Sequence, residues 1–561
     1  MKNLTQKMTV WLLIWLAAAA VLTACRAQGD DVGTTAPDTD PTSETEAAAP
    51  GDLTGWFDYG TALYLRDKFT PGAMTDGIAF EMAKNEKEGF QYLLTAPEDR
   101  EGLRCEVTDL SDGAGHTLSG EVDVAWYLWV NKADFTHARG FTPCMLLPQD
   151  DPYQGGTFDI KAGTARTLFI RYETDKDTVP GTYSGTLSIK QNGEILLSGS
   201  VSVRVRDVYY DEKTECQTTI GATYNPHDGN TAIKPGPDSA PELLHGNEMQ
   251  KIYAEYLLDN RITPSEIPFP NGLRSEGAVE YMLNPRVTLV EYERSSDPDA
   301  LNETYRLAKE NGLLDKFYFG FYDEPHEMEH LGHIIQESLT LNKYYPGFRS
   351  MDALLADLTW KDRNIIEQLS DVTTMYCPKI SIFNGRIRDV MLKLKAERGD
   401  TLFWYTSGSG TVETINITPC TPGADKRVLF WSQYQQNVDG FLYWRAFWWN
   451  DHEDVWDDGY MTLKHKFPKS DAFPTDDGVL VYWHPTTGLP VSTLGLESIR
   501  DGIEDFQLMK MAEAAVGREA VLAIVEQITT DPIEYLRYED GSAPVIERLK
   551  AELFNLIDPA A

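Results

Sequence analysis

The residues best suited to chemistry in this sequence are two adjacent carboxylates, Asp323 and Glu324. They directly follow the apolar segment FYFGFY at residues 317–322 and precede Pro325. Neighbouring residues on a strand point to opposite faces, so the two can share a pocket only where the chain is already turning. Pro325 disfavours helical geometry at Glu324 and is compatible with such a turn. One protonated carboxyl and one charged neighbour are the groups that glycosidic cleavage requires.

Aromatic and polar side chains occur near the ends of the other predicted strands. Sugar rings have apolar C–H faces that stack on aromatic rings, and their hydroxyls need polar partners. We therefore predict that substrate is bound by Tyr322, Asp352, Tyr376, Trp404, Tyr405, Trp444, Trp448 and Asn450. Of the tryptophans, we favour Trp404 and Trp448 as sugar platforms. The alternative for each is a place in the core, because strand side chains alternate between two layers.

Two other interpretations compete for the region around Asp323 and Glu324. Both carboxylates could lie at a helix N-terminus and interact with its macrodipole. Residues 326–330 also read His-Glu-Met-Glu-His, a zinc motif that needs both imidazoles on one helix face. Because Pro325 adjoins His326, that histidine is expected at the mouth of the helix, outside its regular turns. We predict a solvated helix start, with no metal and no other cofactor.

The segments that position these residues alternate between strands and helices after Tyr210. Predicted strands cover 218–223, 286–292, 317–322, 348–354, 372–377, 401–406 and 440–444. Predicted helices cover 248–260, 300–312, 327–345, 385–399 and 426–437. This alternation predicts an α/β fold with a TIM-like (β/α)8 barrel at 211–520, followed by a C-terminal helical segment at 521–561. A doubly wound sheet is the alternative. In a barrel the site lies where the strands end.

Residues 53–210 have the period-two pattern of an all-β sandwich. Asn192-Gly193 lies between two alternating runs and predicts a two-residue hairpin turn, because both residues tolerate positive φ. Fold alone does not establish a function, so a scaffold role and a carbohydrate-binding role are both open, and we favour the scaffold.

The N-terminal 25 residues predict a lipoprotein signal peptide. An apolar run at 10–22 follows two lysines and is too short to span a bilayer. It ends in Leu-Thr-Ala-Cys, which resembles the bacterial lipobox and predicts lipidation of Cys25. Residues 26–52 are acidic and lack aromatic residues, which predicts a disordered tether. The expected location is the cell surface or periplasm, with the membrane reached only through the lipid anchor.

Composition limits the partners further. The chain of 561 residues has 50 Lys+Arg and 87 Asp+Glu, a net charge of −37, so it should repel nucleic acid. We predict a glycan as partner and no nucleic acid. Beyond Cys25, the cysteines show no CxxC pairing, so a disulfide framework is not indicated.

Four segments in order resemble the catalytic domain of glycoside hydrolase family 123. They are FYFGFYDEP, TLFWYTSG, KRVLFWSQYQQNVDGFLYWRAFWW, and LVYWHP with the following LGLESIRDGIEDFQ. The resemblance covers about 317–507, and NEKEGFQYLL is similar to the family's N-terminal strands. It implies a β-sandwich before a (β/α)8 barrel, and an exo-acting, retaining β-N-acetylgalactosaminidase. It also implies that Asp323 assists the substrate's acetamido group and that Glu324 is the general acid/base.

Three functions remain open from the sequence. The first is a surface-anchored exo-glycosidase for terminal β-linked N-acetylhexosamine. The second is a non-catalytic glycan-binding lipoprotein, and the third is a zinc metallohydrolase using His326 and His330. Two further segments have a structural role as the alternative to a functional one. The charges at 500–505 fit an ion network at a helix start better than catalysis. Asn260-Arg261 either contacts sugar or caps the helix that precedes it.

Overall fold

The computed structural model describes residues 52–130, 140–222, 247–292, 297–407, 415–418, 421–448, 456, 477–532 and 534–559. The predicted signal peptide with Cys25, all but the last residue of the predicted tether, and Asn450 lie outside these ranges. Across the described ranges, no helix combines the length and the apolar character needed to cross a bilayer.

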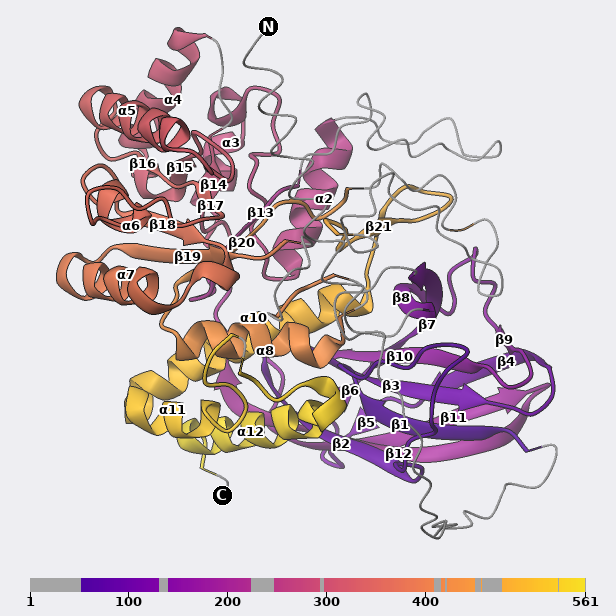
Figure 1. The fold of residues 1–561 in the computed structure, drawn as a ribbon. Helices are drawn as coiled ribbons and strands as arrows, with labels where there is room; N and C mark the ends of the chain where they lie inside the picture. The colour runs from indigo at the N-terminus through magenta and orange to yellow at the C-terminus, as the bar shows by residue number, and fades with distance from the viewer. Residues whose placement is uncertain are drawn as a thin grey trace, which may run out of the picture. The chain divides into compact units, whose positions relative to one another are not determined.

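The N-terminal part forms two packed β-sheets, as the period-two pattern predicts (Figure 1). One sheet has the order β1 (Thr54–Tyr59), β3 (Lys87–Thr95), β10 (Ala165–Glu173), β7 (Gly120–Val130) and β8 (Gly140–Pro148). The other has the order β2 (Gly77–Lys84), β12 (Glu194–Tyr209), β11 (Gly181–Gln191), β4 (Arg100–Val107) and β9 (Phe158–Ile160), with β5 (Leu110–Ser111) and β6 (Thr117–Leu118) beside β11. Apolar side chains of both sheets share one buried core, including Tyr92 and Val203.

The predicted hairpin turn joins β11 to β12. Gln191 pairs with Glu194, so only Asn192 and Gly193 form the loop. Their φ angles are 52° and 85°, the left-handed values that a type I′ turn requires of both central residues. The prediction from the Asn-Gly pair is confirmed.

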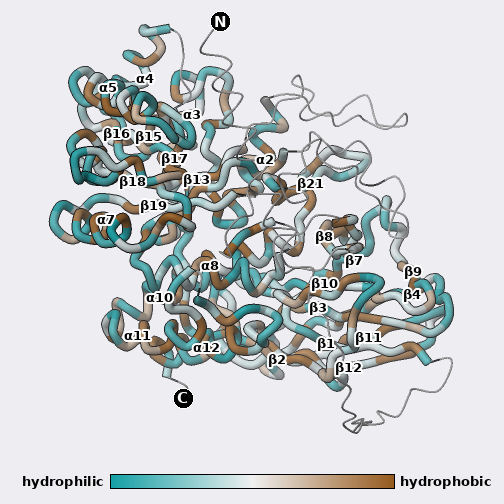
Figure 2. The backbone as a smooth tube through the Cα atoms, in the orientation of Figure 1, coloured by the Kyte–Doolittle hydropathy of each residue, from teal (hydrophilic) through white to brown (hydrophobic). Residues whose placement is uncertain are grey.

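Short parallel strands alternate with helices after Tyr210, as predicted. The strands are β13 (Gln217–Ile220), β14 (Val290–Glu291), β15 (Phe317–Phe319), β16 (Arg349–Ser350), β17 (Ala353–Leu354), β18 (Met375–Pro378), β19 (Thr401–Tyr405) and β20 (Gly440–Tyr443). The helices are α2 (Asn247–Asp259), α3 (Ala278–Leu283), α4 (Pro298–Glu310), α5 (Met328–Tyr344), α6 (Ile365–Leu369), α7 (Gly385–Arg398) and α8 (Gly423–Gln435). Figure 2 shows hydrophobic and hydrophilic residues alternating around the turns of α5 and α7, which indicates helices with one buried face.

The strands show the coarser part of the fold prediction, a mixed α/β arrangement, without a closed TIM-like barrel among the described residues. Among the described residues they form a five-stranded sheet, β13-β20-β19-β18-β17, and a three-stranded sheet, β14-β15-β16, and no single closed sheet. One physical reason lies between β16 and β17, where Asp352 binds the backbone N–H groups of Phe321 and Tyr322 through its side chain and interrupts the ladder. The parallel strands and the helices between them form a mixed α/β architecture.

The C-terminal helices pack on α8 and on the sandwich. They are α10 (Leu494–Val516), α11 (Arg518–Val525) and α12 (Ser542–Ile557), and they follow the small pair β21 (Tyr482–Trp483) and β22 (Pro490–Val491). Helix α10 contacts α8, α11, α12 and β8, and α12 contacts β2 (Figure 1). These helices therefore form one layer across the predicted boundary at residue 520.

A buried ion cluster joins the sandwich to this helical layer. Arg427 on α8 contacts Asp505 at 2.6 Å, and Glu88 and Glu547 at 3.1 Å each. Lys550 on α12 contacts Glu86 and Glu88 at 2.6 Å each. On α10, the cluster is extended by Glu497, Arg500, Asp501 and Glu504. The segments NEKEG and IRDGIED thus meet in the interior, so the predicted ion network exists but is buried within α10.

Arg261 belongs to the same cluster and is not near the carboxylates Asp323 and Glu324. Its guanidinium pairs with Glu504 at 3.2 Å and donates to the backbone carbonyls of Asn85 and Asp211. Asn260 donates to the carbonyl of Tyr256 at the end of α2. The capping alternative for this dipeptide therefore agrees with the structure.

We expect the melting temperature to be highest near pH 4.5, to fall as pH rises from 4.5 to about 7, and to fall as pH drops from 4.5 to about 2. Burial raises the pKa of Glu86 and Glu547 to about 7, so the stability they contribute is complete below pH 4.5 and lost as pH rises through 7. Although burial opposes it, Arg427 and Lys550 lower the pKa of Glu88 to about 2; its contribution is present above pH 4.5 and lost as pH falls through 2. Thermal unfolding followed by circular dichroism across this range tests the expectation. In Glu86→Gln the decline between pH 4.5 and 7 should flatten, and an unchanged decline would contradict the assignment.

Candidate active site

A cavity of about 420 Å³ lies at the C-terminal ends of the parallel strands. Its wall carries four carboxylates, Glu266, Glu291, Asp323 and Asp352. Its aromatic residues are Tyr318, Phe321, Tyr322, Tyr443 and Trp444. A volume of this size suits a small ligand such as one sugar ring, and acids combined with aromatic rings suit its two kinds of surface.

Asp323 and Glu324 lie in the turn that follows β15. Glu324 has φ of 47°, a left-handed conformation uncommon outside glycine, and its N–H donates to the carbonyl of Ala353 at 3.1 Å. This turn breaks the alternation of a regular strand. Asp323 is exposed to the cavity, where burial and the neighbouring charge of Glu324 raise its pKa. The turn therefore gives two adjacent residues a shared environment.

Tyr405, at the end of β19, binds Glu324. Its hydroxyl donates to Glu324 Oε1 at 2.7 Å. Burial and this hydrogen bond raise the pKa of Tyr405, and the charge of Asp323 adds to the effect. The structure therefore brings Asp323, Glu324 and Tyr405 together. Tyr405, which the sequence predicted to bind sugar, binds the carboxylate of Glu324.

Asp352 holds the turn from the neighbouring strand. Its Oδ1 accepts the backbone N–H groups of Phe321 at 2.5 Å and Tyr322 at 2.7 Å. These bonds fix the chain immediately before Asp323. Asp352 also lines the cavity, so contact with substrate stays a prediction.

The two histidines of the H-E-x-x-H motif do not share a helix face. Helix α5 begins at Met328, so His326 precedes it. His330 Nε2 is within 2.8 Å of the Tyr322 hydroxyl, and the two rings stack at 4.0 Å. His326 Nδ1 lies 3.1 Å from the carbonyl oxygen of Glu324. The two imidazole rings lie 4.6 Å apart, but among the described residues no third His, Cys, Asp or Glu joins them in a group that could hold a metal ion. Asp323 and Glu324 also precede the first turn of α5, which weakens the macrodipole alternative.

Residues 287–512 match a family model described as the catalytic domain of glycoside hydrolase 123. The chain carries a glycoside hydrolase 123 catalytic domain. Asp323, Glu324 and Tyr405 all lie within the matched segment.

One solved structure shows the same architecture, and two others match at much lower TM-scores. A family 123 glycoside hydrolase from Clostridium perfringens, described for glycolipid glycan hydrolysis, is 12% identical and has a TM-score of 0.64, covering 90% of this chain and 98% of that chain. An FMN-binding β-glucuronidase from Facaelibacterium prausnitzii L2-6 has a TM-score of 0.27 at 11% identity, covering 76% of this chain and 60% of that chain. A family 39 glycoside hydrolase from Bacteroides cellulosilyticus WH2 also has a TM-score of 0.27, at 10% identity, covering 71% and 80%. No curated protein matches this chain. The Clostridium perfringens structure shares the fold of this chain.

Two of the residues predicted to bind substrate lie outside the site of the glycoside hydrolase 123 domain. The hydroxyl of Tyr376 donates to Asp400 Oδ2 at 2.9 Å, and Asp400 precedes β19 at the opposite end of the sheet. Trp404 is 0% exposed, and its indole N–H donates to Gln433 on α8 at 3.2 Å. The structure contradicts both predictions, because alternation turns Tyr376 and Trp404 toward the helices while Tyr405 faces the other side of the sheet.

The tryptophan pair after β20 stands at the cavity. Trp444 lines it and is 37% exposed, and its ring centroid lies 5.4 Å from that of the half-buried Trp448. The geometry thus favours Trp444 as a sugar platform, with Trp448 in ring contact with it. Asn450 lies outside the described residues.

Sequence reasoning missed several polar residues of the glycoside hydrolase 123 cavity. Arg445 pairs with Glu266 at 3.1 Å, and the Tyr318 hydroxyl donates to Glu291 at 3.3 Å. Burial and the nearby Glu266 raise the pKa of Glu291 to about 7. Glu291 is the last residue but one of a predicted strand and the last residue of β14, so the strand-end rule that selected Asp323 could have found it. Burial lowers the pKa of Lys379, and the charge of Glu324 partly opposes this effect. No motif or strand end in the sequence pointed to Lys379.

We expect Tyr405→Phe to lower kcat/KM about ten- to hundredfold. The substitution removes a hydrogen bond to a carboxylate, which is worth about 1.5–3 kcal/mol, and leaves Glu324 free to rotate. The matched control is Tyr376→Phe, which removes a tyrosine hydroxyl from the neighbouring strand at the far end of the sheet. Steady-state kinetics on a chromogenic glycoside should separate the two. Equal losses in both variants would contradict a role for Tyr405 at the site.

Proposed function

We propose that this glycoside hydrolase removes terminal β-linked N-acetylhexosamine, most specifically N-acetylgalactosamine, from glycans by a retaining, substrate-assisted mechanism. The observation that carries the proposal is the turn after β15: Asp323 lines a cavity of about 420 Å³, and Glu324 follows it with a left-handed φ of 47°. Trp444 and Tyr322 in the same wall suit the apolar face of a sugar.

In this mechanism Glu324 protonates the glycosidic oxygen while the acetamido oxygen of the substrate attacks the anomeric carbon. Oε1 of Glu324 accepts the Tyr405 hydroxyl, and within the described residues Oε2 has no hydrogen-bond partner, which leaves it for the leaving group. Asp323 accepts the acetamido N–H and stabilises the positive charge of the cyclic oxazolinium intermediate. Glu324 then removes a proton from water, which opens the ring with net retention.

We further propose that the two parallel sheets are parts of one irregular (β/α)8 barrel. Backbone hydrogen bonds at 263–265 support it: Ile220 donates to Thr263 at 3.0 Å, and Ser265 donates to Ile220 at 2.8 Å. Glu291 donates to Ser265 at 2.7 Å. This short segment would therefore supply the strand between β13 and β14. An experimental structure in which 263–265 lies away from β14 would refute the closure.

The leader supports a proposed location for the enzyme. We infer that Cys25 is lipidated and that the acidic stretch 26–52 holds the folded part away from the membrane at the cell surface or in the periplasm. Labelling of growing cells with a palmitate analogue should mark the wild-type chain and not Cys25→Ser. Equal labelling of both would refute the anchor.

The test is inhibition by GalNAc-thiazoline, which mimics the cyclised intermediate. We expect competitive inhibition of β-GalNAc aryl glycoside hydrolysis, with a Ki far below KM. Asp323→Asn should lower kcat about 10²–10³-fold with little change in KM, because its stabilising charge acts mainly in the transition state. Insensitivity to the thiazoline together with hydrolysis would overturn substrate assistance. Sugar binding without hydrolysis would favour a non-catalytic glycan-binding protein.

A further inference from the structure

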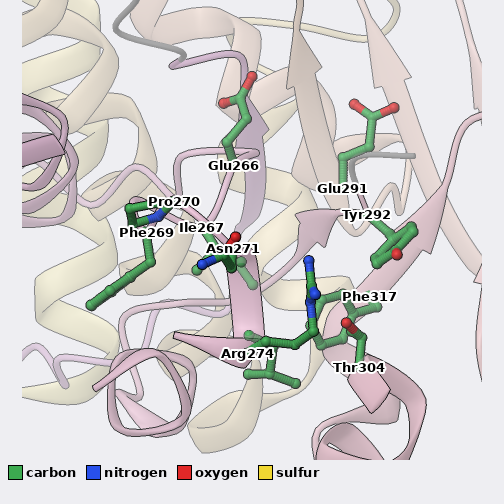
Figure 3. A pocket seen from close by; sticks show the side chains of 12 residues that line it. Glu266, Ile267, Phe269, Pro270, Asn271, Arg274, Glu291, Tyr292, Thr304 and Phe317 are labelled. Atoms are coloured by element: carbon green, nitrogen blue, oxygen red, sulfur yellow. The ribbon is translucent and has the colours of Figure 1, made fainter. Parts of the chain in front are cut away.

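A second hollow of about 220 Å³ adjoins the catalytic cavity. Glu266 and Glu291 belong to the walls of both, so the two spaces meet at these side chains (Figure 3). The rest of the second wall comes from the loop at 267–274 and from Tyr292, Thr304 and Phe317. A ligand in the catalytic cavity therefore has a neighbouring space into which a substituent can extend.

Arg274 lies in this hollow, which we name the side hollow, with its charge unpaired. It ends the short helix η1 (Gly272–Arg274), and its side chain extends toward the space between Glu266 and Glu291 (Figure 3). Its backbone N–H donates to the carbonyl of Asn271 at 3.2 Å, and within the described residues its guanidinium makes no hydrogen bond or ion pair. In a chain of net charge −37, carboxylates outnumber cationic side chains, so an arginine at a cavity is expected to have a carboxylate partner, and Arg274 has no ion pair in the part of the chain that the structure describes.

A hydrogen bond from Arg306 lowers the pKa of Glu303 and the charge of Arg274 adds to this effect, but Glu303 is paired with Arg306 at 2.6 Å. Glu266 and Glu291, the two carboxylates that line the side hollow, do not neutralise the charge of Arg274 either. Glu266 pairs with Arg445 and accepts the N–H of Ala222 at 2.7 Å, both on the side of the catalytic cavity. Glu291 accepts the Tyr318 hydroxyl, and its pKa of about 7 leaves it only partly ionised near neutral pH. In Figure 3 both carboxylates turn away from Arg274.

The remaining wall offers further donors and little competing charge. The amide of Asn271 and the hydroxyl of Tyr292 line the side hollow beside Arg274. Burial raises the pKa of the Tyr292 hydroxyl, and the charge of Arg274 partly opposes that rise. Phe269 and Phe317 supply apolar walls. A guanidinium presents paired donors that match the planar oxygens of a carboxylate or a sulfate, and it binds them more strongly where water is partly excluded.

We propose that the side hollow receives an anionic substituent of the substrate, held by Arg274. This inference rests on the proposed function, because it extends the sugar site by one subsite. The shared chemistry is a singly charged oxyanion, and it could come from a sulfate ester on the terminal sugar or from the carboxylate of an adjoining acidic sugar.

Calorimetric binding to the full chain tests the subsite independently of turnover. The probes are N-acetylgalactosamine, its 6-sulfate and 4-sulfate, and a disaccharide of N-acetylgalactosamine with glucuronic acid. We expect at least one charged probe to bind about tenfold or more tightly than the neutral sugar, with the advantage reduced by added NaCl. Which probe gains identifies the source of the anion.

Arg274→Met should remove that advantage and leave binding of the neutral sugar unchanged, whereas Arg274→Lys should keep part of it. The matched control is Arg548→Met, an exposed arginine on α12, which should bind all probes as the wild type does. If neutral and charged probes bind equally, or if Arg274→Met keeps the advantage, the side hollow is no anion subsite. Failure to hydrolyse any neutral N-acetylhexosaminide would refute the proposed function alone, because the binding comparison still decides the subsite.

Discussion

Glu324→Gln should lower kcat on an aryl β-N-acetylgalactosaminide about 10²–10⁴-fold while the protein keeps its fold. The amide has the shape of the carboxyl group, and its oxygen can still accept the hydroxyl of Tyr405, but it cannot supply a proton to the leaving oxygen. The loss should therefore be largest for substrates with poor leaving groups and smallest for activated aryl glycosides. Steady-state kinetics over a series of leaving groups measures this dependence.

The control for this result is Glu327→Gln, an exposed glutamate at the start of α5 that does not line the cavity. It should retain wild-type kinetics. With Glu324→Ala, azide should partly restore turnover of an activated substrate and yield a glycosyl azide of retained configuration, because a small nucleophile then replaces the missing base. Wild-type turnover in Glu324→Ala would refute the assignment.

Arg427→Met should lower the free energy of unfolding by about 3–5 kcal/mol, the cost of removing one partner from a buried ion pair. Arg427 is 1% exposed, and its loss leaves Glu88 and Asp505 buried without their principal cation. Denaturation in urea, followed by circular dichroism, gives the value. The methionine keeps the length of the side chain, so the loss reports charge more than volume.

Two further variants check the cause of that loss. Adding Asp505→Asn to Arg427→Met should recover part of the stability, because the double variant removes one of the carboxylates left without a partner. Arg548→Met breaks an exposed pair on α12 and should change stability by less than about 1 kcal/mol. A loss for Arg427→Met as small as that of the control would show that the cluster does not stabilise the fold. A large loss would support the scaffold role of the sandwich, whose Glu86 and Glu88 belong to the cluster.

Local patterns in the sequence predicted much of the fold. The alternation of β11 and β12 around Asn192-Gly193 predicted a hairpin because only residues that tolerate positive φ can occupy both turn positions. The parallel strands and the helices between them lie close to their predicted ranges, because strand and helix periods are local properties of the chain. The same locality predicted the turn at Asp323 and Glu324, since Pro325 limits the backbone of the residue before it.

Tertiary structure decided which side chains meet. Trp404 and Tyr405 are equivalent in the sequence pattern, yet one packs against α8 and the other binds Glu324, because the face of a strand that borders the cavity depends on how the sheets and helices pack. Partners far apart in the chain, such as Glu88 with Arg427, carry no local signal because a pair contact depends on distance in space. The elements, the adjacent carboxylates and the acidic charge follow from the residues and their order along the chain. Packing alone decided the cavity, the side hollow with Arg274, and the buried ion cluster, because each is formed by segments that only the folded chain brings together.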